Sequence, residues 1–100
     1  LEWLVEQQTK KTAEFYGMDD RGVIAPGMRA DLNVIDFENL HIHGPEMVND
    51  LPAKGKRLIQ QIDGYRYTVK SGVVTYEDGQ PTGEMPGQLV RGPQAAPTLP

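Results

Sequence analysis

Cysteine is absent from this chain of 100 residues, which excludes a disulfide framework and a thiolate zinc site and fits a reducing compartment. Basic charge is scarce: ten Lys and Arg stand against fourteen Asp and Glu, a net charge of −4. Nucleic-acid binders concentrate basic charge on one face, so no nucleic-acid partner is expected. No apolar run approaches the roughly 20 residues of a membrane span, and no signal-peptide pattern is visible. We therefore expect no membrane contact and a cytoplasmic location.

The N-terminus offers no helix-starting signal. Leu1 is not an initiator methionine, and Trp3, Leu4 and Val5 already have the character of a helix interior, with no Ser, Thr, Asp or Asn before them as an N-cap. A domain of this length also buries only roughly 60–65% of its unfolded surface. The expectation is a segment cut from a longer protein that covers its apolar faces.

Residues 1–17 are predicted to form an amphipathic helix. Gly17 follows as the natural residue to end it, because it tolerates a left-handed conformation. The apolar stripe of a helix with 3.6 residues per turn comprises Leu1, Leu4, Val5, Thr12, Phe15 and Tyr16. This stripe is expected to dock on a core.

Residues 22–36 predict a turn followed by a strand. Pro26 and Gly27 suit the two central positions of a type II turn. Leu32 and Val34 then share one face of an extended segment and Ile35 lies on the other, which indicates a strand covered at least partly on both sides.

Residues 37–63 give the weakest signal, because Gly and Pro interrupt them repeatedly. Little regular structure is expected there, and Leu58 to Ile62 could be a helical turn or a short strand. A stretch of this kind is expected to pack over a neighbouring domain.

Residues 65–77 predict a β-hairpin. A two-residue turn, Ser71-Gly72, fixes the register, so Val69 should pair with Val74. The same register pairs Tyr67 with Tyr76, Thr68 with Thr75, and Arg66 with Glu77. One face would be apolar and the other polar.

His41 and His43 are the one pair that suggests a metal. Two imidazoles at i and i+2 of a strand point to one side and can share a cation. A catalytic zinc ion needs a third protein ligand, however, and Glu46 or Asp50 would supply it only from a loop of no fixed geometry. Ordinary loop or interface histidines are the favoured interpretation, with a zinc site as the alternative.

No other set of residues suggests catalysis. Asp19, Asp20 and Arg21 are interpreted as a solvated turn, and Asp31 and Asp36 as residues that serve turns. Glycines form no phosphate loop, and no Ser, His and Asp set is organised for nucleophilic attack. Tyr65, Tyr67 and Tyr76 are interpreted as hairpin core or domain interface. We therefore predict no catalytic, cofactor-binding or metal-binding residue in the chain.

Three separated stretches resemble one family. Residues 22–36, GVIAPGMRADLNVID, resemble the G-x-I-x-P-G-x-x-A-D-L-x-V-x-D signature near the C-terminus of amidohydrolase-superfamily enzymes. Residues 64–74 are similar to the strand, turn and strand that close the small β-sandwich of those enzymes. Residues 78–92 resemble the ending of the N-acyl-D-amino-acid deacylase branch.

The resemblance implies a fold for this chain and places catalysis in the rest of the parent protein. The class is α+β: residues 1–17 would be the last helix of a (β/α)8 barrel, 18–91 the C-terminal part of a partial β-sandwich with mainly antiparallel strands, and 92–100 a disordered tail. The parent would hydrolyse the amide bond of N-acyl-D-amino acids with a metal-activated water, zinc being held in the barrel before Leu1. The chain itself would be structural and non-catalytic.

Two kinds of partner follow from this assignment. The missing barrel and N-terminal strands of the parent would cover the chain, and its unpaired strand edges could also join two copies. An alternative from another class is an autonomous small β module for protein interaction, suggested by the 65–77 hairpin.

Overall fold

The computed structural model describes residues 1–99, which begin with one helical segment. Residues 2–15 are helical throughout, with a π-helical turn in the middle: α1 (Glu2–Glu6), a π turn (Gln7–Lys11) and α2 (Thr12–Phe15). The hydroxyl of Thr12 donates to the Gln7 carbonyl at 2.7 Å, five residues back, as the wider turn allows. Gly17 ends the helix with a φ of +69°, as predicted.

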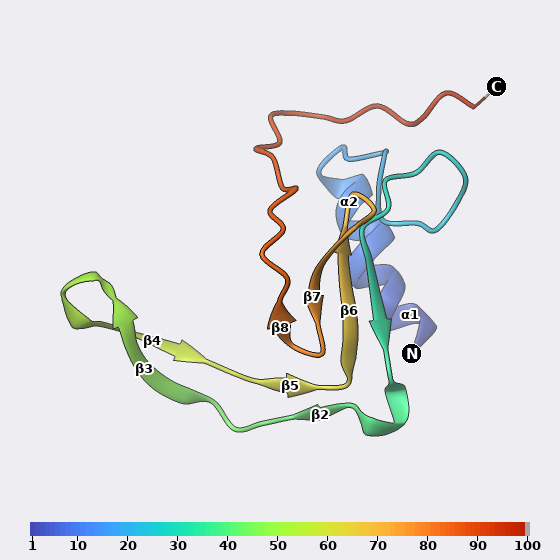
Figure 1. Cartoon of the computed structure of the whole chain (residues 1–100). Helices are drawn as coiled ribbons and strands as arrows, with labels where there is room; N and C mark the ends of the chain where they lie inside the picture. Colours follow the sequence, from blue (N-terminus) through green and yellow to red (C-terminus); the bar gives the residue numbers. More distant parts are fainter. Residues whose placement is uncertain (100) are drawn as a thin grey trace.

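A four-stranded antiparallel sheet forms the body of the chain (Figure 1). Its strands, in spatial order, are β1 (Leu32–Ile35), β6 (Tyr65–Lys70), β7 (Val73–Glu77) and β8 (Gln80–Pro81). The turn at Pro26-Gly27 precedes β1: the Met28 amide donates to the Ala25 carbonyl at 3.1 Å, and Gly27 has a φ of +83°. Both the predicted turn and the predicted strand are confirmed.

The β6–β7 hairpin is present, but its predicted register is only partly right. Val69 pairs with Val74 across the Ser71-Gly72 turn, as expected. Beyond that pair a β-bulge shifts the register, so Tyr76 lies opposite Thr68 instead of Tyr67, and Tyr67 lies opposite Glu77. The bulged residue is Thr75, and its hydroxyl donates to the Thr68 carbonyl at 3.1 Å. That bond stabilises an extra residue that side-chain alternation alone does not predict.

Residues 41–63 form a two-stranded arm, so the expectation of little regular structure in 37–63 is wrong. The outward strands are β2 (His41–Ile42) and β3 (Glu46–Leu51), and the returning strands are β4 (Gly55–Ile59) and β5 (Ile62–Asp63). Short 3₁₀ turns stand before the arm and at its tip (Phe37–Asn39 and Pro52–Lys54). Figure 1 shows the arm leaving the sheet and extending away from it. Proline is compatible with such a ribbon because Pro45 and Pro52 lie where pairing is interrupted.

The register of the arm separates two faces. His43 continues the register of the β2–β5 pair, because its amide donates to the Gln61 carbonyl. The β3–β4 pair is shifted by one residue from that register. The extra residue lies at Gly44-Pro45. Because a one-residue bulge inverts alternation, the cross-strand pairs Ile42–Ile62 and Met47–Leu58 share one face. Leu58, Ile59 and Ile62 thus belong to strands, which settles the alternative that the sequence left open.

Gly64 turns the chain from the arm into the sheet. Its φ is +100°, and a Cβ there would lie 2.9 Å from the Leu40 Cα. Its carbonyl accepts a hydrogen bond from the Asp36 amide at 2.8 Å. Only glycine meets both the conformation and the close backbone approach.

The class is α+β, as predicted: one N-terminal helix followed by mostly antiparallel strands in small sheets. Ala13 is the one buried apolar residue of 1–99, at 9% exposure. The exposed surface is 8233 Å², whereas a self-contained domain of this mass exposes about 5,700 Å². The radius of gyration is 16.1 Å against about 13 Å for a compact domain of this length. The elements are therefore formed without a core of their own.

Candidate functional site

A charged clamp joins the start of β1 to the turn between β6 and β7. Lys70 Nζ lies 2.9 and 3.0 Å from the two carboxylate oxygens of Asp31, and the Ser71 amide donates to the same carboxylate at 2.8 Å. Partial burial acts to raise the pKa of Asp31, but the hydrogen bonds from Lys70 and Ser71 outweigh it and the pKa is lowered. The carboxylate is thus held in its charged form as a structural tie.

Asp20 is a second carboxylate that binds cationic side chains, and with the clamp it forms one charged cluster. Arg21 Nε donates to one of its oxygens at 2.7 Å, and Arg29 Nε donates to the other at 3.1 Å. The hydrogen bond from Arg21 is the main cause of a lowered Asp20 pKa, against a smaller opposing effect of burial. Asp20 and Arg21 each have side chains only 16% exposed. The interpretation of residues 19–21 as a solvated turn is therefore wrong for Asp20, because two arginines enclose it.

Asp36 serves a turn, as expected. Asn39 donates to its carboxylate through the side-chain amide at 2.8 Å, and that hydrogen bond lowers the Asp36 pKa. Asp31 likewise serves the β6–β7 turn.

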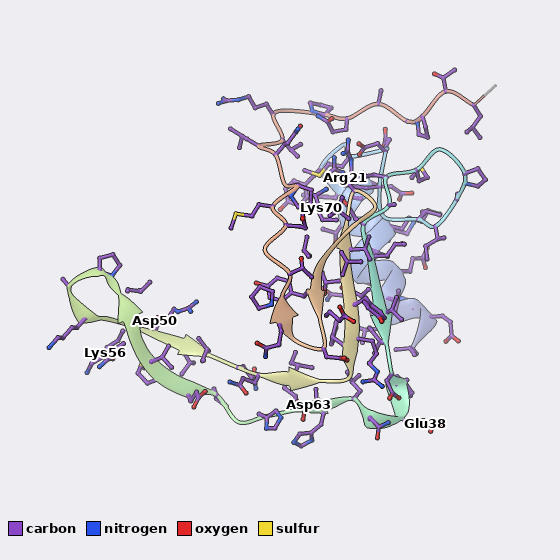
Figure 2. The ribbon with its side chains drawn as sticks, viewed as in Figure 1. Arg21, Glu38, Asp50, Lys56, Asp63 and Lys70 are labelled. Atoms are coloured by element: carbon purple, nitrogen blue, oxygen red, sulfur yellow. The ribbon has the colours of Figure 1, made fainter. Side chains whose placement is uncertain are left out.

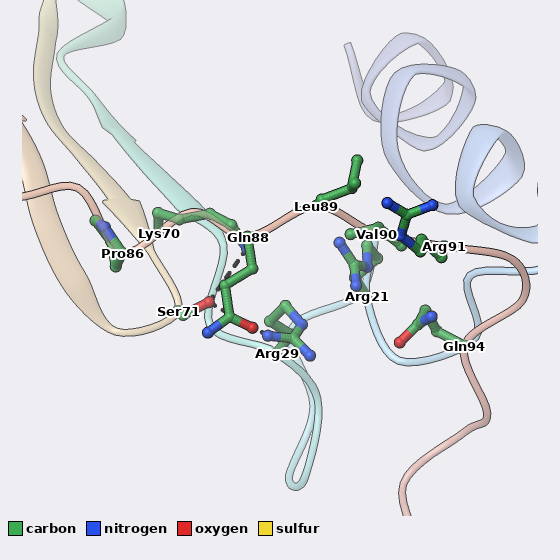
Figure 3. Close-up of a pocket in the computed structure, with 10 residues that line it drawn as sticks. All are labelled: Arg21, Arg29, Lys70, Ser71, Pro86, Gln88, Leu89, Val90, Arg91 and Gln94. Carbon is green, nitrogen blue, oxygen red and sulfur yellow. Dashed lines mark hydrogen bonds between the residues drawn. The ribbon is translucent and has the colours of Figure 1, made fainter.

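A cavity of about 240 Å³ lies beside the clamp (Figure 3). Its walls come from the 20–30 turn, the β6–β7 turn and the segment 86–94. The cationic residues that line it are Arg21, Arg29, Lys70 and Arg91. Figure 2 shows Arg21 and Lys70 near the end of the sheet opposite the arm.

His41 and His43 lie together at the base of the arm. Their rings meet edge to face with centroids 4.8 Å apart, and His43 Nε2 lies 2.8 Å from an Asp63 carboxylate oxygen. Glu46 and Asp50 do not join them: Asp50 binds Arg57 further along the arm. Among residues 1–99, no group of three His, Cys, Asp or Glu side chains could hold a metal ion. The zinc alternative thus gains no third ligand.

Apolar side chains are exposed on each element. The helix stripe that was expected to dock on a core is open, with Phe15 82% and Leu4 52% exposed. Both faces of β1 are open as well, since Val34 and Ile35 are each more than 40% exposed. Exposed apolar surface of this extent marks an interaction surface.

Sequence reasoning missed the charged cavity. Arg21, Arg29 and Lys70 are separated in the sequence, and only the path of the chain brings them and their partners together. The one sequence feature that could have indicated the cavity was the position of Asp31 just before a strand, together with that of Lys70 and Ser71 just before a turn glycine.

Comparison with known proteins gives consistent matches. Residues 1–76 match the Amidohydrolase family. An adenine deaminase of Desulfatibacillum aliphaticivorans is 34% identical over 85 residues, which cover 68% of this chain and 15% of that protein. A dihydroorotase of Desulforapulum autotrophicum is 32% identical over 73 residues, covering 64% of this chain and 17% of that protein.

The chain thus spans less than a fifth of the length of the curated relatives it matches. No solved structure gives a significant match. Within residues 1–99, no helix is both long and apolar enough to cross a membrane.

Proposed function

This chain belongs to the Amidohydrolase family, and on that premise we propose that it is the structural C-terminal segment of a metal-dependent hydrolase of N-acyl-D-amino acids. The deacylase branch is favoured by residues 78–92, whose sequence resembles the ending of that branch. The two curated relatives, an adenine deaminase and a dihydroorotase, are named for other substrates. The proposed substrate class therefore rests on the resemblance of residues 78–92.

One observation carries the structural role: the chain exposes about 2,500 Å² more than a self-contained domain of its mass would. Interfaces of obligate partners bury about 2,000–5,000 Å² in total, or about 1,000–2,500 Å² on each partner, so the excess is at the upper end of what a permanent partner covers. The rest of the parent supplies such a partner. Its N-terminal strands would pair with the open edge of β1 and complete the partial β-sandwich.

The metal of the parent would lie outside this chain. Catalytic zinc takes three protein ligands and keeps an open position, and residues 1–99 offer no such group. Zinc bound in the barrel would activate the water that attacks the amide carbonyl.

We propose the same division of the chain as the sequence predicts. Residues 1–17 are the last barrel helix, 18–91 the sandwich segment and 92–100 a tail. The Gln94 amide donates to the Gly17 carbonyl at 2.8 Å, so the tail is tied at this point, and Pro100 lies outside the described residues. A cytoplasmic location is proposed with the cysteine-free composition as support.

Hydrolysis by the full-length protein tests this function. N-acetyl-D-amino acids and their L-enantiomers are assayed before and after chelation, with zinc restored afterwards. The expected result is release of acetate from D-substrates, lost on chelation and regained with zinc. Activity on adenine or on dihydroorotate, with none on the N-acyl-D-amino acids, would overturn the substrate class and keep the family.

A second candidate is the autonomous β module. The hydrogen-bonded β1–β6–β7–β8 sheet favours it, because such a sheet can form locally. The lack of a buried core counts against it, since isolated strand pairs are marginally stable in water.

A further inference from the structure

The cavity beside the clamp carries more positive than negative charge. Its four cations, Arg21, Arg29, Lys70 and Arg91, face two carboxylates, Asp20 and Asp31. The surplus of two positive charges stands out in a chain whose net charge is −4. A concave surface lined by charges of one sign raises the local concentration of ions of the opposite sign.

Donors remain available in this cluster. Within residues 1–99, the hydrogen bonds of Arg21 use Nε and Nη2, and those of Arg29 use Nε and Nη1. One terminal nitrogen of each guanidinium is thus uncommitted there. Arg91 forms no ion pair within the same residues. Figure 3 shows Arg21 between Arg91 and Arg29, and Ser71 beside Arg29.

The lining is also polar where it is not charged. Ser71, Gln88 and Gln94 contribute hydroxyl and amide groups to the wall. The volume of about 240 Å³ exceeds by more than tenfold the roughly 10–15 Å³ that one water needs. The space therefore accommodates a polyatomic ion together with part of a larger molecule.

We propose that this cavity is a binding site for a phosphoryl dianion, either free phosphate or the phosphate group of a small molecule. The surplus of two charges matches a dianion, and guanidinium forks suit the tetrahedral oxygens of phosphate. Asp20 and Asp31 hold Arg21, Arg29 and Lys70 in place, so the site is preorganised. This inference is independent of the proposed hydrolase activity.

Calorimetric titration of the full-length protein tests the site. Inorganic phosphate, phenyl phosphate and acetate are titrated at an ionic strength held constant with chloride, which screens equally in each case. Saturable binding of phosphate is expected, with acetate at least about tenfold weaker because it carries one charge. Equal affinity of the two phosphates would identify free phosphate as a sufficient ligand, and tighter binding of phenyl phosphate would identify a phosphate monoester.

Two variants place the binding in this cavity. Arg91→Gln removes a charge that no ion pair among residues 1–99 uses, and it should weaken phosphate binding about tenfold or more. Gln88→Glu should abolish it by repulsion. Arg57→Gln is the matched control, since Arg57 lies on the arm and outside the cavity, and it should change the affinity less than twofold.

Three results would overturn the site. The first is no saturable phosphate binding by the wild-type protein. The second is acetate binding as tightly as phosphate, and the third is phosphate binding that Arg91→Gln and Gln88→Glu leave unchanged. The third result would also be obtained if phosphate bound at a metal in the barrel. Melting curves without phosphate confirm that each variant is folded.

Discussion

Lys70 binds the carboxylate of Asp31 through both oxygens, at 2.9 and 3.0 Å, across 39 residues of sequence. Asp31 belongs to the 22–36 motif and Lys70 to the 64–74 stretch, so one ion pair joins two of the stretches that resemble the amidohydrolase superfamily. The neighbouring Ser71 amide bonds the same carboxylate. These two motifs are therefore parts of one structural unit.

Asp31→Ala is expected to destabilise the full-length protein by about 1–2 kcal/mol, because it removes a charged hydrogen bond and leaves the Ser71 amide without its acceptor. The side chains of Lys70 and Asp31 are 32% and 29% exposed, which limits the loss. The measurement is the thermal midpoint. Asp50→Ala serves as control: Asp50 also binds an arginine, Arg57, but both side chains are about half exposed and water screens the pair, so the thermal midpoint should change less than in Asp31→Ala.

Asp20 should make stability depend on pH in the acid range. Its pKa is lowered from 3.8, mainly by the hydrogen bond from Arg21, so its contribution is complete above the unfolded value and is lost as the pH falls through the folded one. The melting temperature of wild type minus that of Asp20→Asn should be constant from about pH 7 to 5 and shrink below about pH 4. A melting-temperature difference that grew as the pH fell would mean that folding raises the Asp20 pKa, and would contradict the stabilising role of Arg21.

Gly64→Ala should destabilise the protein by about 1–3 kcal/mol, since alanine is strained at a φ of +100° and its Cβ would lie 2.9 Å from the Leu40 Cα. Gly87→Ala is the control, because a Cβ there meets no atom within 4 Å. Chemical denaturation measures both. Equal effects of the two substitutions would show that the Gly64 corner is not constrained.

Replacing both His41 and His43 by alanine should leave the zinc content of the full-length protein, and the kcat/KM of the hydrolysis proposed for it, within about twofold of wild type. The reason is that the pair has Asp63 as its only close carboxylate among residues 1–99, where no group of three ligands could hold a metal. Metal analysis and the D-amino-acid assay measure the two quantities. Loss of one zinc ion per chain would restore the alternative that these histidines bind metal.

Short-range signals in the sequence predicted the local structure well. Gly17, Pro26-Gly27 and Ser71-Gly72 each prescribe a backbone conformation, so the helix end and both turns are confirmed. The bulge at Thr75 was not predictable, because it depends on a side-chain bond to a carbonyl seven residues away. The arm was missed since Gly44, Pro45 and Pro52 normally interrupt strands, and here they occupy its bulge and its tip.

The charged cavity could not be foreseen for a different reason. Asp31 and Ser71 are 40 residues apart, and only the pairing of β1 with β6 brings them together. The signature at 22–36 indicated the family but said nothing of the cavity.

Differential scanning calorimetry of residues 1–100 alone tests the central claim, that this chain depends on the rest of a larger protein for its core. A self-contained domain of this length absorbs about 60–80 kcal/mol in one cooperative transition. The account predicts no such transition for the isolated chain, because Ala13 is the one buried apolar residue of those described. A single cooperative peak of that size, at a concentration where the chain is monomeric, would contradict it and favour the autonomous module.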